Sequence, residues 1–209
     1  MLLGAWAALS GLLIAIGIGV LHSSTATAFD HHVTSSVVAH RTPALNAAMK
    51  AVTWLGSWVA LVTTAALMVL LAIRRRLAAI AVVLGIVAWA GEAGAVALAK
   101  RAVQRPRPPR DIWLNTAHGW SWPSGHAATA ALVFAVLALL VTRLFPSRTV
   151  MVASWVVAGL AVAAVGFSRI ELGVHWTTDV IASLVFVSTW LFFVIALFGP
   201  DLQGTRVPR

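Results

Sequence analysis

The chain has 209 residues, of which 60% are hydrophobic and only 10% are charged. Soluble globular proteins carry about 25% charged residues, so this composition excludes a water-soluble domain and indicates one integral membrane domain over residues 1–209. The net charge of +9 would suggest nucleic acid as a partner in a soluble protein. Here the basic residues lie in loops between apolar segments, which favours lipid headgroups and topology signals over nucleic acid. The chain has no cysteine, which excludes disulfides and thiolate metal sites.

The apolar segments are long enough to be membrane-spanning helices, since a span needs about 18 or more apolar residues. They cover residues 3–21, 52–73, 77–98, 126–145, 149–167 and 178–198. The sequence therefore predicts an all-α fold, a six-transmembrane-helix bundle. The first segment resembles a signal peptide because Ala26-Thr27-Ala28 follows it, but no charge precedes Asp30 and the apolar run is long. We interpret it as an uncleaved first span.

The connections between these segments predict the topology. Residues 22–51 are polar, and we expect a short interfacial helix or loop there after the first span. The turns at residues 74–76 and 143–148 are short and rich in arginine, so the positive-inside rule puts them in the cytoplasm with both termini. Residues 22–51, 99–125 and 168–177 then lie on the extracytoplasmic face of the cell inner (plasma) membrane.

Three short blocks of chemically active residues all fall on that one face. The first follows the third span, the second begins the fourth span, and the third joins the fifth span to the sixth. Their residues are Lys100 with Arg107 and Pro108, then Pro123, Ser124, Gly125 and His126, and finally Ser168, Arg169, His175 and Asp179.

The first property of this set is that it suits a phosphate group. Lys100, Arg107 and Arg169 supply positive charge, and guanidinium groups match phosphate oxygens with two parallel hydrogen bonds. Ser124 and Gly125 stand at a predicted helix start, where free N–H groups and the helix dipole attract an anion. These donors suit the charge that develops on phosphate oxygens during phosphoryl transfer.

The second property is a pair of histidines with different neighbours. His175 and Asp179 are four residues apart, so on a helix they share a face, and the carboxylate can hold one ring N–H while the other nitrogen attacks. His126 stands beside the phosphate-binding helix start, where it can protonate the leaving oxygen. The sequence thus offers a nucleophile, an orienting carboxylate, a general acid and an anion site.

The three blocks resemble the signature of the type-2 phosphatidic acid phosphatase superfamily, which reads Lys-x6-Arg-Pro, Pro-Ser-Gly-His and Ser-Arg-x5-His-x3-Asp, and every position is matched. The signature motifs lie within residues 100–179, and the six-span pattern resembles the membrane members of that family over nearly the whole chain. The resemblance implies a membrane lipid phosphatase in which His175 attacks phosphorus and forms a phosphohistidine. It implies no cofactor and no metal, and a lipid phosphate from the bilayer as the partner.

The resemblance also implies a role for each site residue. His126 would protonate the leaving group and then activate water, and Asp179 would orient His175. The phosphate would be bound by Lys100, Arg107, Ser124, Gly125 and Arg169. Undecaprenyl pyrophosphate, phosphatidylglycerophosphate and phosphatidic acid stay open as substrates, and the sequence carries no signal for the oligomeric state.

Two other classes of function were weighed against a lipid phosphatase. One is a phosphotransferase or a vanadate-dependent haloperoxidase-like enzyme of the same superfamily. The other is a non-enzymatic membrane transporter or lipid-binding protein, which should carry broken helices or charges deep in several spans, whereas only Glu92 is so placed.

Several further residues received no catalytic assignment. Glu92 lies inside the third span, either supporting Lys100 or Arg107 or making a structural hydrogen bond across a close helix contact. His31, His32 and His40 are interpreted as surface residues, and Arg41, Lys50, Arg101 and Arg110 as topology or headgroup residues. The tryptophans near the motifs are expected to anchor the protein at the interface or to line a lipid entrance; they are Trp113, Trp120, Trp122 and Trp176.

Overall fold

The computed structural model describes residues 2–74, 77 and 79–204. Every regular element in this part of the chain is helical, which confirms the all-α prediction. The elements are α1 (Leu2–His22), α2 (Ser24–Ala39), α3 (Pro43–Val52), the 3-10 helix η1 (Thr53–Gly56), α4 (Trp58–Ile73), α5 (Ala79–Val103), the 3-10 helix η2 (Arg110–Ile112), α6 (Gly125–Leu144), α7 (Arg148–Glu171) and α8 (Thr177–Gly204).

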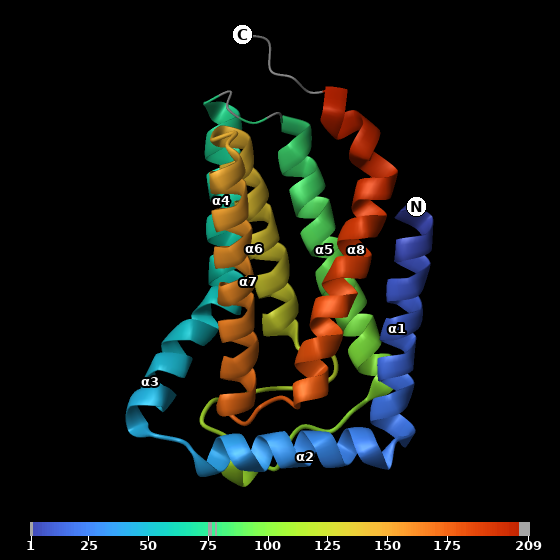
Figure 1. Ribbon diagram of the computed structural model, residues 1–209, viewed down its shortest axis with the longest axis vertical. Helices are drawn as coiled ribbons and strands as arrows, with labels where there is room; N and C mark the ends of the chain where they lie inside the picture. Colours follow the sequence, from blue (N-terminus) through green and yellow to red (C-terminus); the bar gives the residue numbers. More distant parts are fainter. Residues whose placement is uncertain (1, 75–76, 78, 205–209) are drawn as a thin grey trace.

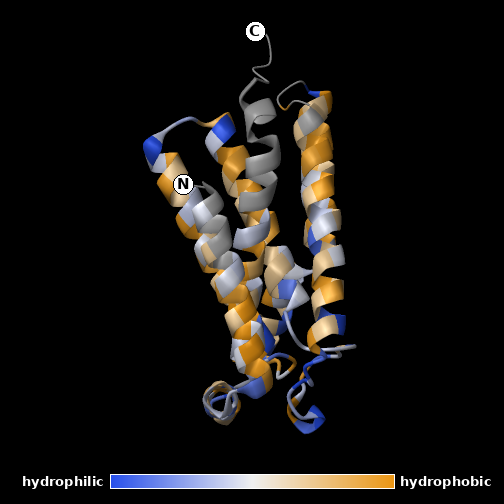
Figure 2. Cartoon of the chain, turned by 90° about the vertical axis from the view of Figure 1, so that its right-hand side faces the viewer, coloured by the Kyte–Doolittle hydropathy of each residue, from blue (hydrophilic) through white to orange (hydrophobic). Residues whose placement is uncertain are grey.

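The long helices run lengthwise beside one another, and α2 lies across one end of them (Figure 1). The chain turns by 83° between α1 and α2, so the polar segment after the first apolar helix, predicted as a helix or loop, begins with a helix that lies across the bundle. The α5–α6 and α7–α8 connections lie at this same end. Hydrophobic residues line the helices, and hydrophilic residues gather at the two ends of the bundle (Figure 2).

Serine and threonine caps explain where several helices begin. The hydroxyl oxygens of Ser57, Ser124 and Ser147 each accept a hydrogen bond from a backbone N–H in the first turn of α4, α6 and α7. Thr42 caps α3 in the same way and is followed by Pro43 in the first turn. Such caps satisfy N–H groups that have no partner within the helix, and proline suits the first helical position.

The sequence predicts six spans, but fewer helices of the described residues are long and apolar enough to cross a membrane. Within the described residues, three helices are long and apolar enough to cross a membrane, and they are Ala81–Val103, Gly125–Leu144 and Arg148–Glu171. Counting two bent pairs, α1 with α2 and residues 43–56 with α4, as one span each raises the number to five. The six-span count is therefore not confirmed, although every predicted segment overlaps a helix, and those at 3–21, 126–145 and 149–167 match α1, α6 and α7 to within a few residues.

The third and sixth predicted spans end later than expected, at Val103 and Gly204 instead of residues 98 and 198. The second predicted span has the wrong start. The prediction began it at residue 52, whereas α4 begins at Trp58 after the η1 turn, with a bend of 43°. The reason is local, because Ser57 has an extended backbone and caps the next helix. Gly56 also touches the neighbouring backbone: a Cβ there would lie 2.4 Å from the carbonyl oxygen of His126. Hydropathy alone does not detect such a break.

Close packing brings the ends of α6, α7 and α8 together. A Cβ on Gly56 would also lie 2.8 Å from Cγ1 of Val165, and a Cβ on Gly166 would lie 2.7 Å from Cγ1 of Val180. Ala127, Ile170 and Val180 form one buried cluster between these helix ends. His126, Arg169 and Asp179 directly precede these three residues in the sequence, so the packing holds the second and third motifs close to one another.

Glu92 is buried within α5, and its neighbour Gly91 marks a close approach to α8. A Cβ on Gly91 would lie 2.2 Å from the ring of Trp190, whose Nε1 donates to the carbonyl oxygen of Ala88 at 2.7 Å. The ion pairs among the described residues do not include Glu92 with Lys100. This arrangement favours the structural reading of Glu92, a residue beside a close helix contact, over support of the site.

Candidate active site

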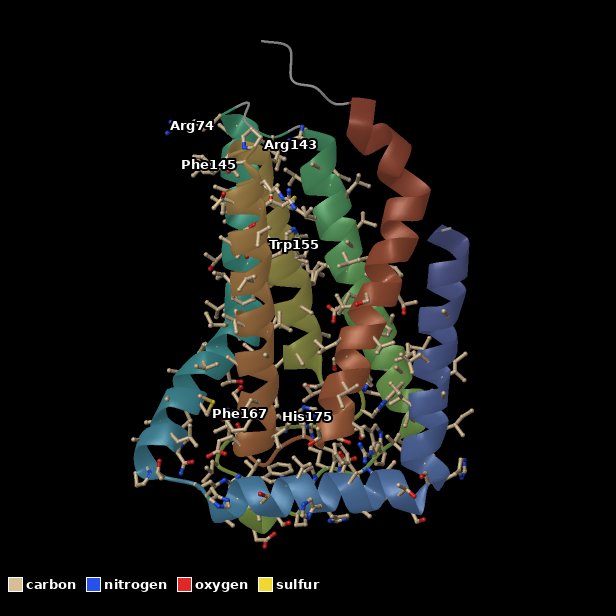
Figure 3. All side chains as sticks on the ribbon, in the orientation of Figure 1. Arg74, Arg143, Phe145, Trp155, Phe167 and His175 are labelled. Atoms are coloured by element: carbon tan, nitrogen blue, oxygen red, sulfur yellow. The ribbon has the colours of Figure 1, made fainter. Side chains whose placement is uncertain are left out.

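The three motifs meet at the end of the bundle that α2 crosses. Lys100 lies in the last turn of α5, Gly125 begins α6, Arg169 lies in the last turn of α7, and Asp179 lies in the first turn of α8. Figure 3 labels His175 between the adjacent ends of α7 and α8, far from Arg74 and Arg143 at the opposite end of the bundle. The motifs therefore lie at one face, as the sequence predicts.

His175 and Asp179 form the pair that the four-residue spacing suggests. Nδ1 of His175 lies 3.3 Å from Oδ2 of Asp179, and both side chains are buried. The same Oδ2 accepts a hydrogen bond of 2.9 Å from the backbone N–H of Trp176, just before α8 begins. This is half of a capping box, in which a carboxylate in the first turn holds the N–H at the helix start. The cap fixes the rotamer of Asp179 and so fixes where its oxygen meets His175.

The other nitrogen of His175 faces Arg107. Nη1 of Arg107 lies 3.0 Å from Nε2 of His175. Because a guanidinium only donates hydrogen bonds, Nε2 must be the acceptor and carries no proton in this arrangement. A neutral ring then has its proton on Nδ1, where Asp179 accepts it. Two independent contacts thus agree on one tautomer, with a lone pair of Nε2 directed at the Arg107 side of the site.

Arg107 is held on its other sides by backbone carbonyls. Its Nη1 also donates to the oxygen of Val174 at 2.6 Å, its Nε donates to Gly119 at 2.9 Å, and its Nη2 donates to His118 at 2.8 Å. The loop from Arg107 to Gly119 therefore folds back on its own arginine. The guanidinium is anchored beside His175 without an acidic partner in any described ion pair, which leaves its positive charge available to an anion.

Lys100 holds the segment just before α6. Its Nζ donates to the carbonyl oxygens of Trp120 at 2.7 Å, Ser121 at 3.2 Å and Pro123 at 2.7 Å. An ammonium group has three hydrogens, so these contacts use all of them. A phosphate that binds Lys100 must displace at least one carbonyl, and the lysine therefore shapes the loop as well as supplying charge.

The start of α6 offers free donors. The hydroxyl of Ser124 accepts from the N–H of Ala127 at 3.5 Å, and the carbonyl of Ser124 accepts from the N–H of Ala128 at 3.0 Å. Among the described hydrogen bonds, none uses the N–H groups of Gly125 or His126. A Cβ on Gly125 would meet no atom within 4 Å, so the space in front of this helix start is open. Free N–H groups at an open helix start suit an anion.

Arg169 is buried with one donor unused. Its Nη1 donates to Oγ1 of Thr53 at 2.6 Å, which ties α7 to the η1 turn. Its Nε is buried and has no hydrogen-bond partner among the described residues. A buried, unpaired guanidinium N–H costs free energy, and a bound anion would relieve that cost. The unused donor is consistent with a phosphate group at this position.

The electrostatic surroundings keep His175 neutral. Burial lowers the pKa of His175 well below its ordinary value, and the positive charges of Arg107, Arg169 and Lys100 lower it further. The pKa of Arg107 is also lowered from its ordinary value by burial, which the negative charge of Asp179 partly offsets. A neutral imidazole with an unprotonated Nε2 among cations is what a nucleophile for phosphate requires.

Three charged residues near the site, Arg105, Asp30 and Arg41, lie outside the predicted site. Arg105 pairs with Asp179 and with Asp30 of α2, both at 2.6 Å, and all three side chains are buried. Arg41 was interpreted as a topology or headgroup residue, but its guanidinium donates to the backbone oxygens of Ile112, at 2.8 Å, and Glu171. A signal was present for Arg105, since it lies in the same rigid proline-rich stretch as Arg107. Asp30 gave no signal, because its partners lie far away in sequence.

Two of the four tryptophans near the motifs are buried and serve to pack the fold, so they do not anchor the protein at the interface. Trp122 is buried and packs with Val20 and Ala182. Trp176 is buried and its Nε1 donates to the carbonyl oxygen of Pro106 at 2.9 Å. Trp120 is exposed and so is free to act as an anchor. His31 is exposed on α2, and its ring meets the edge of Trp176 with 4.8 Å between ring centroids.

The fold and the site together define a helical integral membrane protein with a histidine centre among cations at one end of its bundle. The family model described as the PAP2 superfamily matches residues 76–201, and the chain belongs to that superfamily. The resemblance seen in the three motifs is thereby confirmed.

One relative and two solved structures are similar to this chain, the structures in fold. Phosphatidylglycerophosphatase B of Bacillus subtilis is 32% identical over 110 residues, which cover 51% of this chain and 52% of that protein, so the match spans about half of each. The crystal structure of a transmembrane PAP2 type phosphatidylglycerolphosphate phosphatase from Bacillus subtilis superposes with a TM-score of 0.82, at 24% identity, over 96% of this chain and 98% of that one. The crystal structure of Aquifex aeolicus LpxE superposes with a TM-score of 0.62, at 24% identity, over 80% of this chain and 94% of that one.

Proposed function

We propose that this protein is a lipid phosphatase that hydrolyses a phosphomonoester or pyrophosphate on a membrane lipid, with His175 as the nucleophile. The observation that carries the proposal is the pair of contacts on His175. Arg107 lies 3.0 Å from Nε2 and Asp179 lies 3.3 Å from Nδ1, which together leave an unprotonated nitrogen facing a cation. Membership of the PAP2 superfamily supports the same reaction class.

The first half of the reaction transfers the phosphoryl group to the protein. The lone pair of His175 Nε2 attacks phosphorus, and the bond from phosphorus to the leaving oxygen breaks. His126 gives its proton to that oxygen, so the lipid leaves as an alcohol or as a monophosphate. The proton on Nδ1 stays shared with Asp179, which stabilises the positive charge on the phosphorylated ring.

The second half releases phosphate. Water attacks the phosphohistidine, His126 takes a proton from this water, and the bond from phosphorus to Nε2 breaks. Both histidines return to their starting states, so the cycle needs no other reactant than water. The donors that surround the site stabilise the charge on the phosphoryl oxygens in both steps. They are Lys100, Arg107, Arg169, the hydroxyl of Ser124 and the N–H of Gly125.

The substrate is proposed to be a lipid because the site lies at the end of an apolar bundle, where a headgroup lies at the depth of the catalytic loops. Phosphatidylglycerophosphate, undecaprenyl pyrophosphate and phosphatidic acid are the candidates, and the name of the Bacillus relative favours the first. We also propose six spans in the cell inner membrane, with the site on the extracytoplasmic face and both termini in the cytoplasm. The arginine turns of residues 74–76 and 143–148 support that orientation.

The test is phosphate release by the purified full chain in detergent with EDTA present. The three candidate lipids are compared for the wild type, His175→Ala and the control His22→Ala, which removes an exposed histidine at the end of α1. We expect EDTA-resistant release that is lost in His175→Ala and kept in His22→Ala, with the relative rates identifying the lipid. Folded wild type that releases phosphate only with an added divalent metal, or from none of the lipids, would contradict the proposal.

A further inference from the structure

Arg105 links the catalytic carboxylate to the helix that crosses the end of the bundle. Its Nη1 lies 2.6 Å from Oδ1 of Asp179, and its Nη2 lies 2.6 Å from Oδ2 of Asp30. The two carboxylates come from α8 and α2, which are 149 positions apart in sequence, and each has 1% or less of its side chain exposed. One buried cation therefore stands between two buried anions, and one of these anions is the partner of His175.

The position of Arg105 is fixed by its surroundings as well as by its charge. The backbone oxygen of Arg105 accepts hydrogen bonds from the N–H of Ser121 at 2.9 Å and from its hydroxyl at 3.1 Å. The guanidinium lies 5.6 Å from the ring centroid of Trp176, a distance typical of a cation–π contact. A planar guanidinium can donate to two carboxylates at once in fixed directions. The ammonium group of a lysine carries the same charge but does not fix these directions.

Asp30 completes the start of α8 as well as holding Arg105. Its Oδ1 accepts from the N–H of Thr178 at 2.9 Å, and its Oδ2 accepts from the hydroxyl of Thr178 at 2.6 Å. The N–H groups of a first helical turn have no partner within the helix, and the positive end of the helix dipole favours a carboxylate there. Asp30 is therefore a helix cap supplied by α2, a different segment of the chain.

The contacts of Arg105 favour an indirect role over phosphate binding. Both terminal nitrogens of Arg105 are occupied by buried oxygens, and the Asp179 oxygen that Arg105 contacts is Oδ1, whereas His175 meets Oδ2. Arg105 thus acts on His175 through Asp179. A carboxylate with no exposed surface needs a counter-charge to stay ionised, and an ionised Asp179 is what can accept the Nδ1 proton of His175.

We propose that Arg105 and Asp30 are positioning residues, which keep Asp179 ionised and turned toward His175 and thereby select the tautomer of the nucleophile. This inference rests on the proposed function, since it extends the orienting role of Asp179 outward by two residues. It makes α2 part of the catalytic apparatus, although α2 carries none of the motif residues.

The test uses Arg105→Lys, which keeps the charge but weakens the bridge, and Asp30→Asn, which leaves the contact of Arg105 with Asp179 in place. Asp111→Asn is the matched control, because Asp111 is an exposed acid of the same loop. For each folded molecule, kcat is expected to fall about 10- to 100-fold in the two variants while KM stays close to the wild-type value. Asp111→Asn is expected to keep both constants.

A second readout is independent of turnover. Histidine labelled with ¹⁵N shows by NMR whether Nδ1 of His175 carries the proton, with the signal assigned by its loss in His175→Gln. We expect protonated Nδ1 in the wild type and a mixture of tautomers in Asp30→Asn and Arg105→Lys.

Unchanged kcat for the folded fraction, a raised KM with unchanged kcat, or a wild-type proton on Nε2 overturns the inference. A wild type that shows the Nδ1 tautomer but hydrolyses no lipid overturns the proposed function instead.

Discussion

Arg107 donates a hydrogen bond to Nε2 of His175 at 3.0 Å, so the nitrogen proposed to attack phosphorus is occupied by the arginine proposed to bind phosphate. A phosphoryl group that enters between them would exchange this contact for one from the arginine to a phosphate oxygen, and would free the lone pair at the same time. Binding and activation of the nucleophile are therefore coupled through one side chain.

Arg107→Lys tests this coupling. Lysine keeps the positive charge but offers no planar fork, so it cannot hold Gly119, Val174 and His175 together. We expect kcat/KM for lipid phosphate to fall about 100-fold, with most of the loss in kcat because the orientation of His175 is lost. Steady-state kinetics measure both constants, with Arg110→Lys as the control because Arg110 is an exposed arginine of the same loop. A variant that loses only affinity would show that Arg107 binds substrate without orienting His175.

The lowered pKa of His175 predicts its behaviour in acid. The free side chain titrates near pH 6.5, and burial together with Arg107, Arg169 and Lys100 moves the folded-state pKa well below that value. The attacking ring must be neutral, so it stays competent as the pH falls below about 6.5. NMR titration of labelled histidine, assigned with His175→Gln, measures this directly, and a His175 signal that titrates near pH 6.5 would contradict it.

The same shift has a consequence for stability with a definite sign. Between the folded-state pKa and about pH 6.5, the unfolded chain binds a proton on His175 that the folded chain does not bind. The contribution of this residue to the free energy of unfolding is therefore complete above that range and is lost progressively as the pH falls through it. Thermal unfolding should show that the melting temperature of the wild type falls relative to that of His175→Gln as the pH is lowered from about 6.5.

Lys100→Met should damage the loop as well as the activity. The substitution removes three hydrogen bonds to the carbonyls of Trp120, Ser121 and Pro123. We expect the free energy of unfolding to fall by about 2 kcal/mol, since hydrogen bonds to a charged group are worth more than neutral ones. Lys50→Met, at an exposed position of α3, is the control. Equal melting temperatures for Lys100→Met and the wild type would mean that the lysine does not organise this loop.

How far the sequence predicts this site depends on whether the interacting residues belong to one motif. His175 and Asp179 share a helical spacing, and the three motifs lie at predicted helix ends, so their gathering at one end of the bundle could be predicted from the sequence. Asp30 and Arg105 are 75 positions apart and meet only because α2 folds back across the bundle. No local sequence pattern predicts that α2 crosses the end of the bundle. The neighbouring His31 and His32 indicated an exposed polar surface instead.

In the fold, too, the features that depend on local sequence were predicted and those that depend on contacts between distant segments were not. Apolar length predicted the helices α6 and α7 well, because each is continuous and begins at a serine cap. It placed the second span too early because Gly56 and Ser57 interrupt the helix for reasons of packing and capping, which hydropathy does not measure.

Gly56→Ala tests that packing without changing any polar group. A Cβ at this position would lie 2.4 Å from the backbone oxygen of His126 and 2.8 Å from Cγ1 of Val165, and backbone cannot move aside as a flexible side chain can. We expect a loss of about 1 to 3 kcal/mol in the free energy of unfolding and a lower kcat, because the start of α6 must shift. Gly94→Ala is the control, since a Cβ there meets no atom within 4 Å. If Gly56→Ala melts and turns over like Gly94→Ala, the close contact does not position His126.

The covalent intermediate is the central claim, and rapid quenching after mixing with a lipid labelled with ³²P at its terminal phosphate tests it most directly. The proposed mechanism predicts a phosphoprotein that is labile in acid and stable in base, with the label on the peptide that contains His175, and no label on His175→Gln. Fast release of phosphate by the wild type with no labelled protein at any time, or with the label on another residue, would contradict the mechanism.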